Sequence, residues 1–221
     1  MRGDRLLIEP CHRKAAEAIR HALDTNCSST GRTPVVVSIG GESGSGKSEI
    51  GRALADLYAN DGKAVVLLQQ DDYFRLPPKT NDQKRRRNIG WVGMEEVRLD
   101  LLDAHLMELR EGASELVKPL VDYAANEITD EALQVKNVEI VIVEGTYTTV
   151  LKSVDSRVFI DRTYIQTAAS RRRRARDAQD PFIDQVLELE HQIIAAHIER
   201  ADIVVTSDYG VIAASHNQTE G

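Results

Sequence analysis

A glycine-rich segment, GESGSGKS, extends from Gly41 to Ser48 and has the Gly-x-x-x-x-Gly-Lys-Ser spacing of phosphate-binding loops. Glycines allow backbone N–H groups to approach a phosphate closely, and a helix starting at the loop adds the positive end of its dipole. The apolar run Val35–Ile39 precedes the loop and the amphipathic run Ile50–Tyr58 follows it, which a Gly/Ser linker would not explain. The residues expected to bind a nucleotide are Gly41, Glu42, Ser43, Gly44, Ser45, Gly46, Lys47 and Ser48, with Lys47 on the β- and γ-phosphates and Ser48 on Mg²⁺.

Two adjacent carboxylates, Asp71 and Asp72, follow the apolar run Ala64–Gln69. A carboxylate at the end of a strand beside a phosphate loop could take the proton from an attacking hydroxyl, or orient Mg²⁺ through water. We assign the catalytic base to Asp71 and keep Asp72 as the alternative. The competing interpretation is that the Asp-Asp pair caps a turn.

Glu144 ends another apolar run, in the segment VIVEG. An acidic side chain is costly at the end of a buried strand unless it is paired, hydrogen-bonded or bound to a metal. Glu144 is therefore expected to hold Mg²⁺ together with Ser48 and Asp71. The alternative is a carboxylate satisfied by backbone N–H groups of the turn at Gly145.

Arginines occupy five of the six positions from 171 to 176, late in a helical stretch. Arg172 and Arg176 share one helix face at i, i+4, whereas Arg173 points about 100° away. Arginines over a phosphoryl group stabilise its oxygens during transfer. The run predicts a phosphate-binding lid at about residues 171–182, since so many like charges are repulsive on an ordinary surface. A solvated charged helix is the alternative.

Apolar strands alternate with helical stretches along the chain, which indicates a parallel sheet covered by helices on both faces. Ligands bind such sheets at the carboxyl ends of the strands, where the loop, Asp71 and Glu144 all fall. The first 25 or so residues are expected to form a helix outside the main sheet, with residues 1–33 as helix and linker, 34–208 as the nucleotide-binding domain and 209–221 as a tail. The expected strands are Val35–Ile39, Ala64–Gln69, Val138–Val143, Val158–Asp161 and Ile203–Thr206, and the expected helices after the first are Lys47–Asn60, Glu95–Arg110, Thr163–Asp177 and Pro181–Glu199.

The 221 residues carry a net charge of −7 and only two cysteines, Cys11 and Cys27. This acidic balance argues against nucleic acid or an anionic membrane as the main partner. No apolar run approaches the ~20 residues of a membrane span, and a reducing cytoplasm is the expected location. His105 lies among leucines and is expected to be a structural histidine.

These segments together resemble the uridine kinase and phosphoribulokinase family of P-loop small-molecule kinases, from about Val35 to Val205. The resemblance implies an ATP- and Mg²⁺-dependent phosphotransferase with a five-stranded parallel sheet and a mobile lid that carries arginines. It implies Asp71 as catalytic aspartate, Glu144 as magnesium carboxylate, and Arg172, Arg173 and Arg176 as lid arginines. The carriers are GGESGSGKS (40–48), QDDYF (70–74), PLVDY (119–123), VIVEG (141–145), RRRARD (172–177) and ADIVV (201–205).

The acceptor positions depart from the nucleoside kinases. Those enzymes carry an Asn-Phe/Trp-Asp-His-Pro stretch, and the corresponding residues 90–94, GWVGM, lack the carboxylate and the histidine. Asn126 follows VDY where nucleoside kinases have a histidine that reads the base. Uridine is therefore expected to be a poor acceptor. The residues expected to face the acceptor are Asp72, Tyr73, Trp91, Asp122 and Tyr123.

The basic run Lys84–Arg87 has two interpretations, a solvated loop or a clamp for an anionic group on a small hydroxylated acceptor. A second functional class is a regulatory ATPase or GTPase switch without a metabolite acceptor. The guanine-reading Asn-Lys-x-Asp motif of GTPase switches is missing from the sequence, and Asp71 with the lid arginines favours a kinase. The sequence leaves open whether the protein forms a homo-oligomer.

Overall fold

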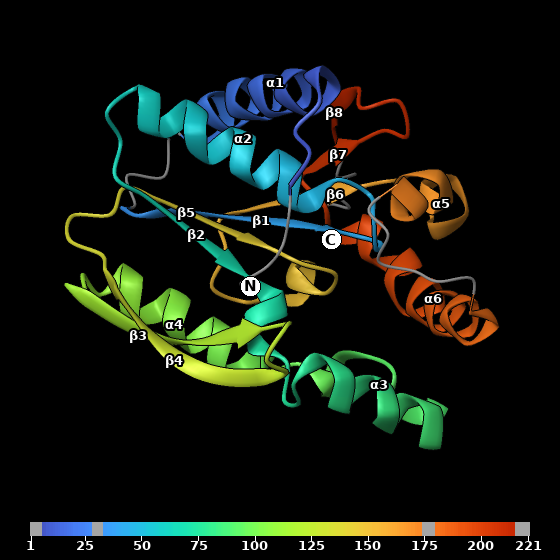
Figure 1. Ribbon diagram of the computed structural model, residues 1–221. Coiled ribbons are helices and arrows are strands. Elements are labelled where there is room, and N and C mark those ends of the chain that lie inside the picture. The colour runs from blue at the N-terminus through green and yellow to red at the C-terminus, as the bar shows by residue number, and fades with distance from the viewer. Residues whose placement is uncertain (1–5, 28–32, 174–179, 215–221) are drawn as a thin grey trace, which may run out of the picture.

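The computed structural model describes residues 6–27, 33–173 and 180–214, without the side chains of residues 169–173. Its centre is a six-stranded sheet in the order β2-β5-β1-β6-β7-β8 (Figure 1). The first five strands in this order are parallel, as expected, and β8 pairs antiparallel with β7. The strands are β1 (Val35–Gly41), β2 (Val65–Gln69), β5 (Ile140–Glu144), β6 (Ser156–Ile160), β7 (Ile203–Val205) and β8 (Val211–Ala213).

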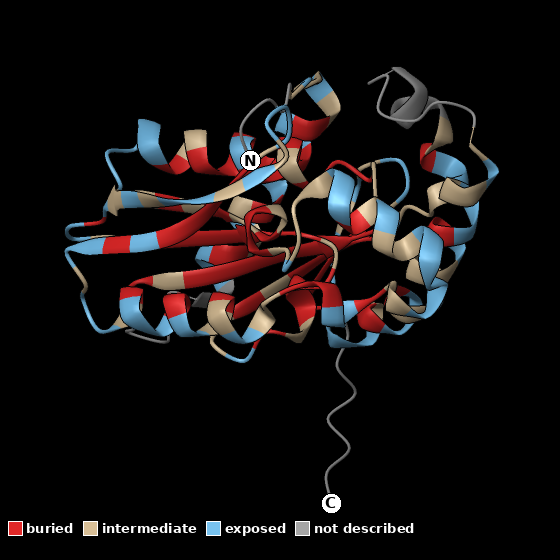
Figure 2. Cartoon of the chain, turned by 60° about the horizontal axis from the view of Figure 1, so that its bottom comes forward, coloured by how far each residue is buried: buried red, intermediate tan, exposed pale blue. Residues whose placement is uncertain are grey.

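Helices cover both faces of the sheet, and each face has its own apolar core. In Figure 1, α1 (Pro10–Cys27) and α2 (Lys47–Asn60) lie on one side of the sheet, and α4 (Leu99–Arg110) lies on the other. Ile194, at the end of α6 (Pro181–Ile194), joins the core on the α4 side. Buried residues follow the strands and the inner helix faces in Figure 2. This two-sided burial explains why the strands are apolar almost throughout.

The expected N-terminal helix forms as α1, which packs against one face of the main sheet and contributes to the core on that face. Ala15, Ile19 and Leu23 on α1 are between 0% and 2% exposed and share a core with strands β1, β6 and β7. Burying a side chain the size of isoleucine or leucine contributes about 1.5–3 kcal/mol. The spacing i, i+4, i+8 of these three residues turns one face of α1 toward the core.

The expected C-terminal tail contributes a strand. Val211–Ala213 forms β8 at the edge of the sheet and follows a tight turn from Thr206 to Gly210. The residue before that glycine, Tyr209, adopts a left-handed backbone conformation with φ of 67°.

Two further elements were not expected from the sequence. Helix α3 (Pro78–Arg87) occupies part of the polar stretch after β2, and strands β3 (Glu115–Asp122) and β4 (Glu127–Gln134) form a separate antiparallel hairpin. Both lie on the α4 side of the molecule (Figure 1). No helix in the described parts of the chain is long and apolar enough to cross a membrane.

The register of the sheet brings the ends of three strands level. Glu144 on β5 aligns with Ile39 on β1 and with Gln69 on β2. The residues that follow these strands are the phosphate loop, Asp71 and the turn at Gly145. The sheet therefore collects at one edge the three segments that the sequence predicts to do chemistry.

Candidate active site

A polar pocket lies at this edge, over the start of α2. It contains the loop lysine and serine, the candidate base and the candidate metal carboxylate, as the sequence predicts. Of the eight loop residues, Gly41, Glu42 and Ser45 are not among its lining residues. The lining residues are Ser43, Gly44, Gly46, Lys47, Ser48, Glu49, Asp71, Glu144 and Thr146.

The phosphate loop has the backbone conformation that its glycines allow. Gly46 has φ of 105° and is the residue immediately before α2, which begins at Lys47. Lys47 Nζ donates to the carbonyl oxygen of Glu42 at 2.8 Å, so the ammonium group lies across the loop. A cation and a helix N-terminus at one point form an anion-binding site.

Asp71 and Asp72 have opposite environments although they are adjacent. Asp71 lines the pocket, and burial raises the pKa of its carboxyl while Lys47 opposes the rise. Asp72 is 2% exposed, accepts from Lys118 Nζ at 2.8 Å and accepts from Val121 N at 3.0 Å. Asp72 therefore fastens hairpin strand β3 to the end of β2. The two carboxylates therefore differ in position: Asp71 lines the pocket and Asp72 does not.

Glu144 is buried at the end of β5, with 5% of its surface exposed. Burial and the nearby charge of Asp71 raise its pKa to about 7. Lys47 and hydrogen bonds from Gln69 and Ser48 act in the opposite direction, and Gln69 Nε2 donates to Glu144 Oε1 at 3.1 Å. The carboxyl group of Glu144 therefore binds a proton more readily than an ordinary glutamate, because neighbouring groups compensate only part of its negative charge.

The residues present fit a magnesium–nucleotide complex. Ser48 and Glu144 are close enough to interact, and Asp71 lies near enough to raise the Glu144 pKa. Hydroxyl and carboxylate oxygens are the ligands that Mg²⁺ prefers, and the raised pKa of Glu144 indicates a carboxylate that lacks a full counter-charge. Ser48 and Glu144 would hold the ion, which when bound neutralises charge on the β- and γ-phosphates.

Glu42, the second residue of the loop, points its side chain away from the pocket. Its carboxylate accepts from Tyr164 N at 2.5 Å and lies 2.7 Å from His191 Nδ1. Tyr164 begins helix α5 (Tyr164–Arg173), and His191 lies on α6. Glu42 therefore ties the phosphate loop to the two helices that flank the expected lid.

The expected lid lies only partly within the described residues. Arg172 and Arg173 belong to α5, although their side chains are not described, and Arg176 lies outside the described residues. Thr167 Oγ1 on the same helix is 3.0 Å from the carbonyl oxygen of Ser43. The helix that carries the first lid arginines is thus anchored directly on the phosphate loop.

We expect Arg172→Ala and Arg176→Ala to lower kcat more than Arg171→Ala and Arg174→Ala. In the helix that the sequence predicts over this stretch, the first two arginines share one face, from which both would reach the same phosphoryl group. Steady-state kinetics on the four single variants measures the ranking. The reverse ranking would show that the opposite face of the helix meets the nucleotide.

Tyr73, expected to contact the acceptor, is 0% exposed, and its Oη lies 2.8 Å from His105 Nδ1. This burial corrects the expectation for Tyr73, as the ion pair does for Asp72, and agrees with a structural role for His105. Trp91 donates from Nε1 to Asn81 Oδ1 at 2.9 Å. Over the described residues, the lining of the phosphate pocket does not include Trp91, Asp122 or Tyr123.

The basic run Lys84–Arg87 forms the last turn of α3, and two of its residues, Arg85 and Arg86, form ion pairs within the protein. Arg85 makes two hydrogen bonds to the fully buried carboxylate of Glu96, at 2.6 and 2.9 Å, and its Nη2 lies 3.2 Å from Glu190 Oε1. Arg86 pairs with Asp82 at 2.8 Å and with Asp180 at 2.5 Å.

Sequence reasoning missed several residues around the site. Thr146 lines the pocket two residues after Glu144, and its place after a strand end was the signal that could have found it. Gln69 orients the carboxylate of Glu144, and Lys118 orients that of Asp72. Both contacts join segments about 45 or more residues apart, which no local pattern reveals.

Comparison with known proteins agrees with this geometry. The model of the Phosphoribulokinase / Uridine kinase family matches residues 36–180. A bifunctional alpha-galactosidase/sucrose kinase, AgaSK, from Mediterraneibacter gnavus is 31% identical over 84% of the chain, which spans 21% of that relative. A uridine kinase from Leuconostoc citreum is 27% identical over 79% of the chain and 88% of the relative.

Solved structures share the fold. A D-glycerate 3-kinase from Cryptococcus neoformans aligns over 93% of this chain and 100% of its own, with a TM-score of 0.60 and 14% identity. A phosphoribulokinase from Rhodobacter spheroides aligns over 79% of this chain and 70% of its own, with a TM-score of 0.60 and 14% identity. With a family model covering well over half of its length, the chain belongs to the phosphoribulokinase and uridine kinase family of P-loop kinases.

Proposed function

We propose that this protein is an ATP- and Mg²⁺-dependent kinase that transfers the γ-phosphate to a hydroxyl group of a neutral sugar. The observation that carries the choice of acceptor is the pairing of Arg85 with both Glu96 and Glu190. The two carboxylates neutralise the positive charge of this guanidinium, so it would attract an anionic acceptor only weakly. The pairing therefore counts against the clamp interpretation of the basic run.

The charges around this cluster also favour hydroxyl groups. Glu190 is close enough to Asp71 and Lys47 for both charges to affect its pKa, which burial raises. Carboxylates accept hydrogen bonds from sugar hydroxyls and repel phosphate or carboxylate groups. The likeness to a sucrose kinase supports the same class of acceptor, and the absent base-reading groups argue against uridine.

In this proposal Asp71 accepts the proton of the attacking hydroxyl. Lys47 and the backbone N–H groups of the loop hold the phosphates, and the lid arginines exclude water and stabilise the transferring group. The site consumes ATP and would act in the cytoplasm. A regulatory ATPase without an acceptor is the competing function.

An acceptor panel separates these possibilities. We expect ATP-dependent ADP release with sucrose, fructose or a related neutral sugar, and at least a hundredfold lower kcat/KM with uridine and D-glycerate, since missing hydrogen-bond partners cost several orders of magnitude. Coupled detection of ADP, with product identification by NMR and a control without acceptor, makes the measurement. Equal ADP release with and without any acceptor would favour the regulatory ATPase, and efficient phosphorylation of D-glycerate would restore the anionic alternative.

A further inference from the structure

Two carbonyl groups of the phosphate loop, those of Ser43 and Ser45, accept hydrogen bonds from side chains of distant segments. When successive N–H groups converge on an anion, the carbonyls between them point outward and need partners of their own. The carbonyl of Ser43 meets Thr167 Oγ1, as described above. The carbonyl of Ser45 accepts from Tyr209 Oη at 3.2 Å. Tyr209 lies beyond β7, 164 residues from Ser45 in the sequence.

The hydroxyl of Tyr209 is itself held by two other side chains. His12 Nδ1 accepts from Glu9 N at 3.1 Å, so the ring proton is on Nε2, which lies 3.0 Å from Tyr209 Oη. Arg162 Nη1 donates to the same oxygen. The hydroxyl therefore accepts two hydrogen bonds, and its single proton is directed to the carbonyl of Ser45.

Tyr209 is also fixed by packing and by its backbone. Its ring meets that of His12 edge-on, with centroids 4.9 Å apart, and the guanidinium of Arg162 lies 4.5 Å above it. A Cβ at Gly46 would lie 2.9 Å from Tyr209 Oη and 3.3 Å from His12 Nε2, so both groups touch the loop. A left-handed conformation is costly for tyrosine, and such strain is retained where surrounding contacts impose it.

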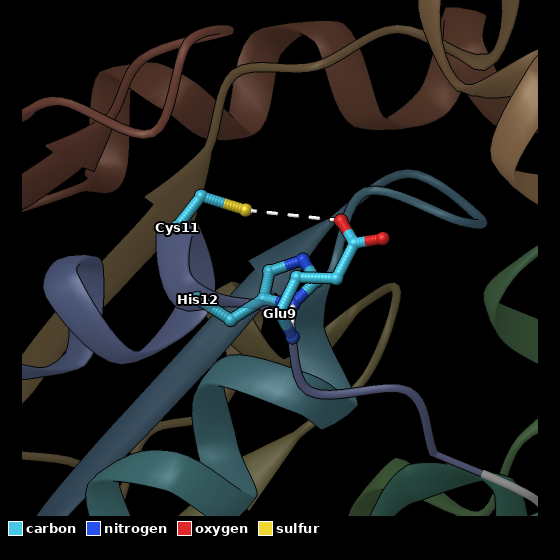
Figure 3. A group of neighbouring side chains, drawn as sticks. All are labelled: Glu9, Cys11 and His12. Atoms are coloured by element: carbon cyan, nitrogen blue, oxygen red, sulfur yellow. Dashed lines mark hydrogen bonds between the residues drawn. The ribbon is translucent and has the colours of Figure 1, made fainter.

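A metal ion is a poor explanation for this cluster. Glu9, Cys11 and His12 bring three potential ligand atoms within 4.8 Å, and Cys11 Sγ is 4.0 Å from Glu9 Oε2 (Figure 3). Yet His12 Nδ1 faces an N–H group and Nε2 faces Tyr209, so neither nitrogen presents a free lone pair. The cation of Arg162 and the positive end of α1 would also repel a metal.

We propose that Tyr209 positions the phosphate loop for ATP, with His12 and Arg162 holding its hydroxyl. The anchor fixes the peptide between Ser45 and Gly46, just before the helix that supports the phosphates. His12 and Tyr209 both lie outside residues 36–180, the range that matches the family model. Helix α1 and the turn before β8 are thereby part of the ATP site, a role that holds for any acceptor.

The test removes only the hydroxyl. We expect Tyr209→Phe to weaken binding of MgATP and of inorganic tripolyphosphate each about tenfold, the loss expected for one hydrogen bond. Titration calorimetry on the full chain measures both and needs no acceptor, so its outcome is independent of the sugar assignment. Tyr58→Phe is the matched control, since Tyr58 Oη donates to Asp24 at 3.4 Å and links α2 to α1 away from the loop.

His12 provides a second arm. We expect His12→Ala to weaken tripolyphosphate binding three- to fivefold, and His12→Gln to restore most of it, because the glutamine amide can donate to the same hydroxyl. Wild-type tripolyphosphate binding by Tyr209→Phe, or equal weakening by Tyr58→Phe, would overturn the proposal. Weaker MgATP binding with unchanged tripolyphosphate binding would also overturn it, since Tyr209 would then contact the nucleoside instead of the loop.

Discussion

Asp71→Asn is expected to lower kcat by about 10²-fold or more while the affinity for MgATP changes little. The amide has the shape of the carboxylate but cannot accept the proton of the attacking hydroxyl. Asp71 suits this role because burial raises the pKa of its carboxyl group, which makes the carboxylate a stronger base. The positive charge of Lys47 limits this rise and so favours the ionised form that can accept a proton.

Rapid-mix single-turnover measurements with saturating ATP and acceptor would report the chemical step. Lys47→Ala is the contrasting variant, because loss of its charge should weaken ATP binding as well as turnover. Wild-type turnover by Asp71→Asn would contradict a role as base. Asp72 would be a poor substitute, since it is buried against Lys118 and the backbone of β3.

The sequence predicted the central sheet well because the strands are buried on both sides. Continuous apolar runs, each followed by a helix, leave few arrangements other than a covered parallel sheet. The same signal placed Asp71 and Glu144, since each directly follows such a run. The register that aligns Ile39, Gln69 and Glu144 then brings the candidate site residues together without any further local sequence signal.

The elements that were missed lack this signal. Helix α3 contains no large apolar residue, and ion pairs such as those of Arg85 and Arg86 hold it. Strand β4 is polar along most of its length and, among the strands of the described residues, pairs only with β3. Ion pairs to distant residues hold α3, and pairing with the adjacent strand β3 holds β4, so neither segment needs the apolar periodicity that would have revealed it.

The errors at Asp72 and Tyr73 have a common cause. Both directly follow Asp71, in a 3-10 turn from Gln70 to Tyr73, where successive side chains point in different directions. Asp71 lines the pocket, Asp72 reaches the hairpin, and Tyr73 enters the core against His105. A position next to the proposed base in the sequence therefore did not predict a place in the lining of the pocket.

Glu144→Gln is expected to stabilise the metal-free protein at pH 8 while weakening MgATP. The folded-state pKa of Glu144 is about 7, above its ordinary value of 4.5, so the native protein binds more protons than the unfolded chain between these two values. Stability from this group is therefore complete below about pH 4.5 and is lost as the pH rises through 7. Glutamine cannot ionise, so the variant avoids the loss, by up to about 3 kcal/mol.

Thermal unfolding without Mg²⁺ or nucleotide, at pH 5 and pH 8, gives the first readout. The variant should have the higher Tm at pH 8, and the difference should largely vanish at pH 5. Glu139→Gln is the matched control with the opposite sign, because Lys63, whose Nζ donates to Glu139 Oε2 at 2.6 Å, lowers the pKa of this exposed carboxylate. A Tm at pH 8 below that of the wild type would contradict the expected cost of ionised Glu144.

Nucleotide binding gives the second readout, and it links this cost to function. We expect Glu144→Gln to weaken MgATP at least tenfold and ATP in EDTA much less, since a carboxylate that binds the metal matters only when metal is present. Equal weakening of both ligands would exclude a metal role. If both measurements give the expected result, ionised Glu144 lowers the stability of the protein without ligand and binds the cation of MgATP. The cost in stability is then the consequence of keeping a metal ligand in a buried position.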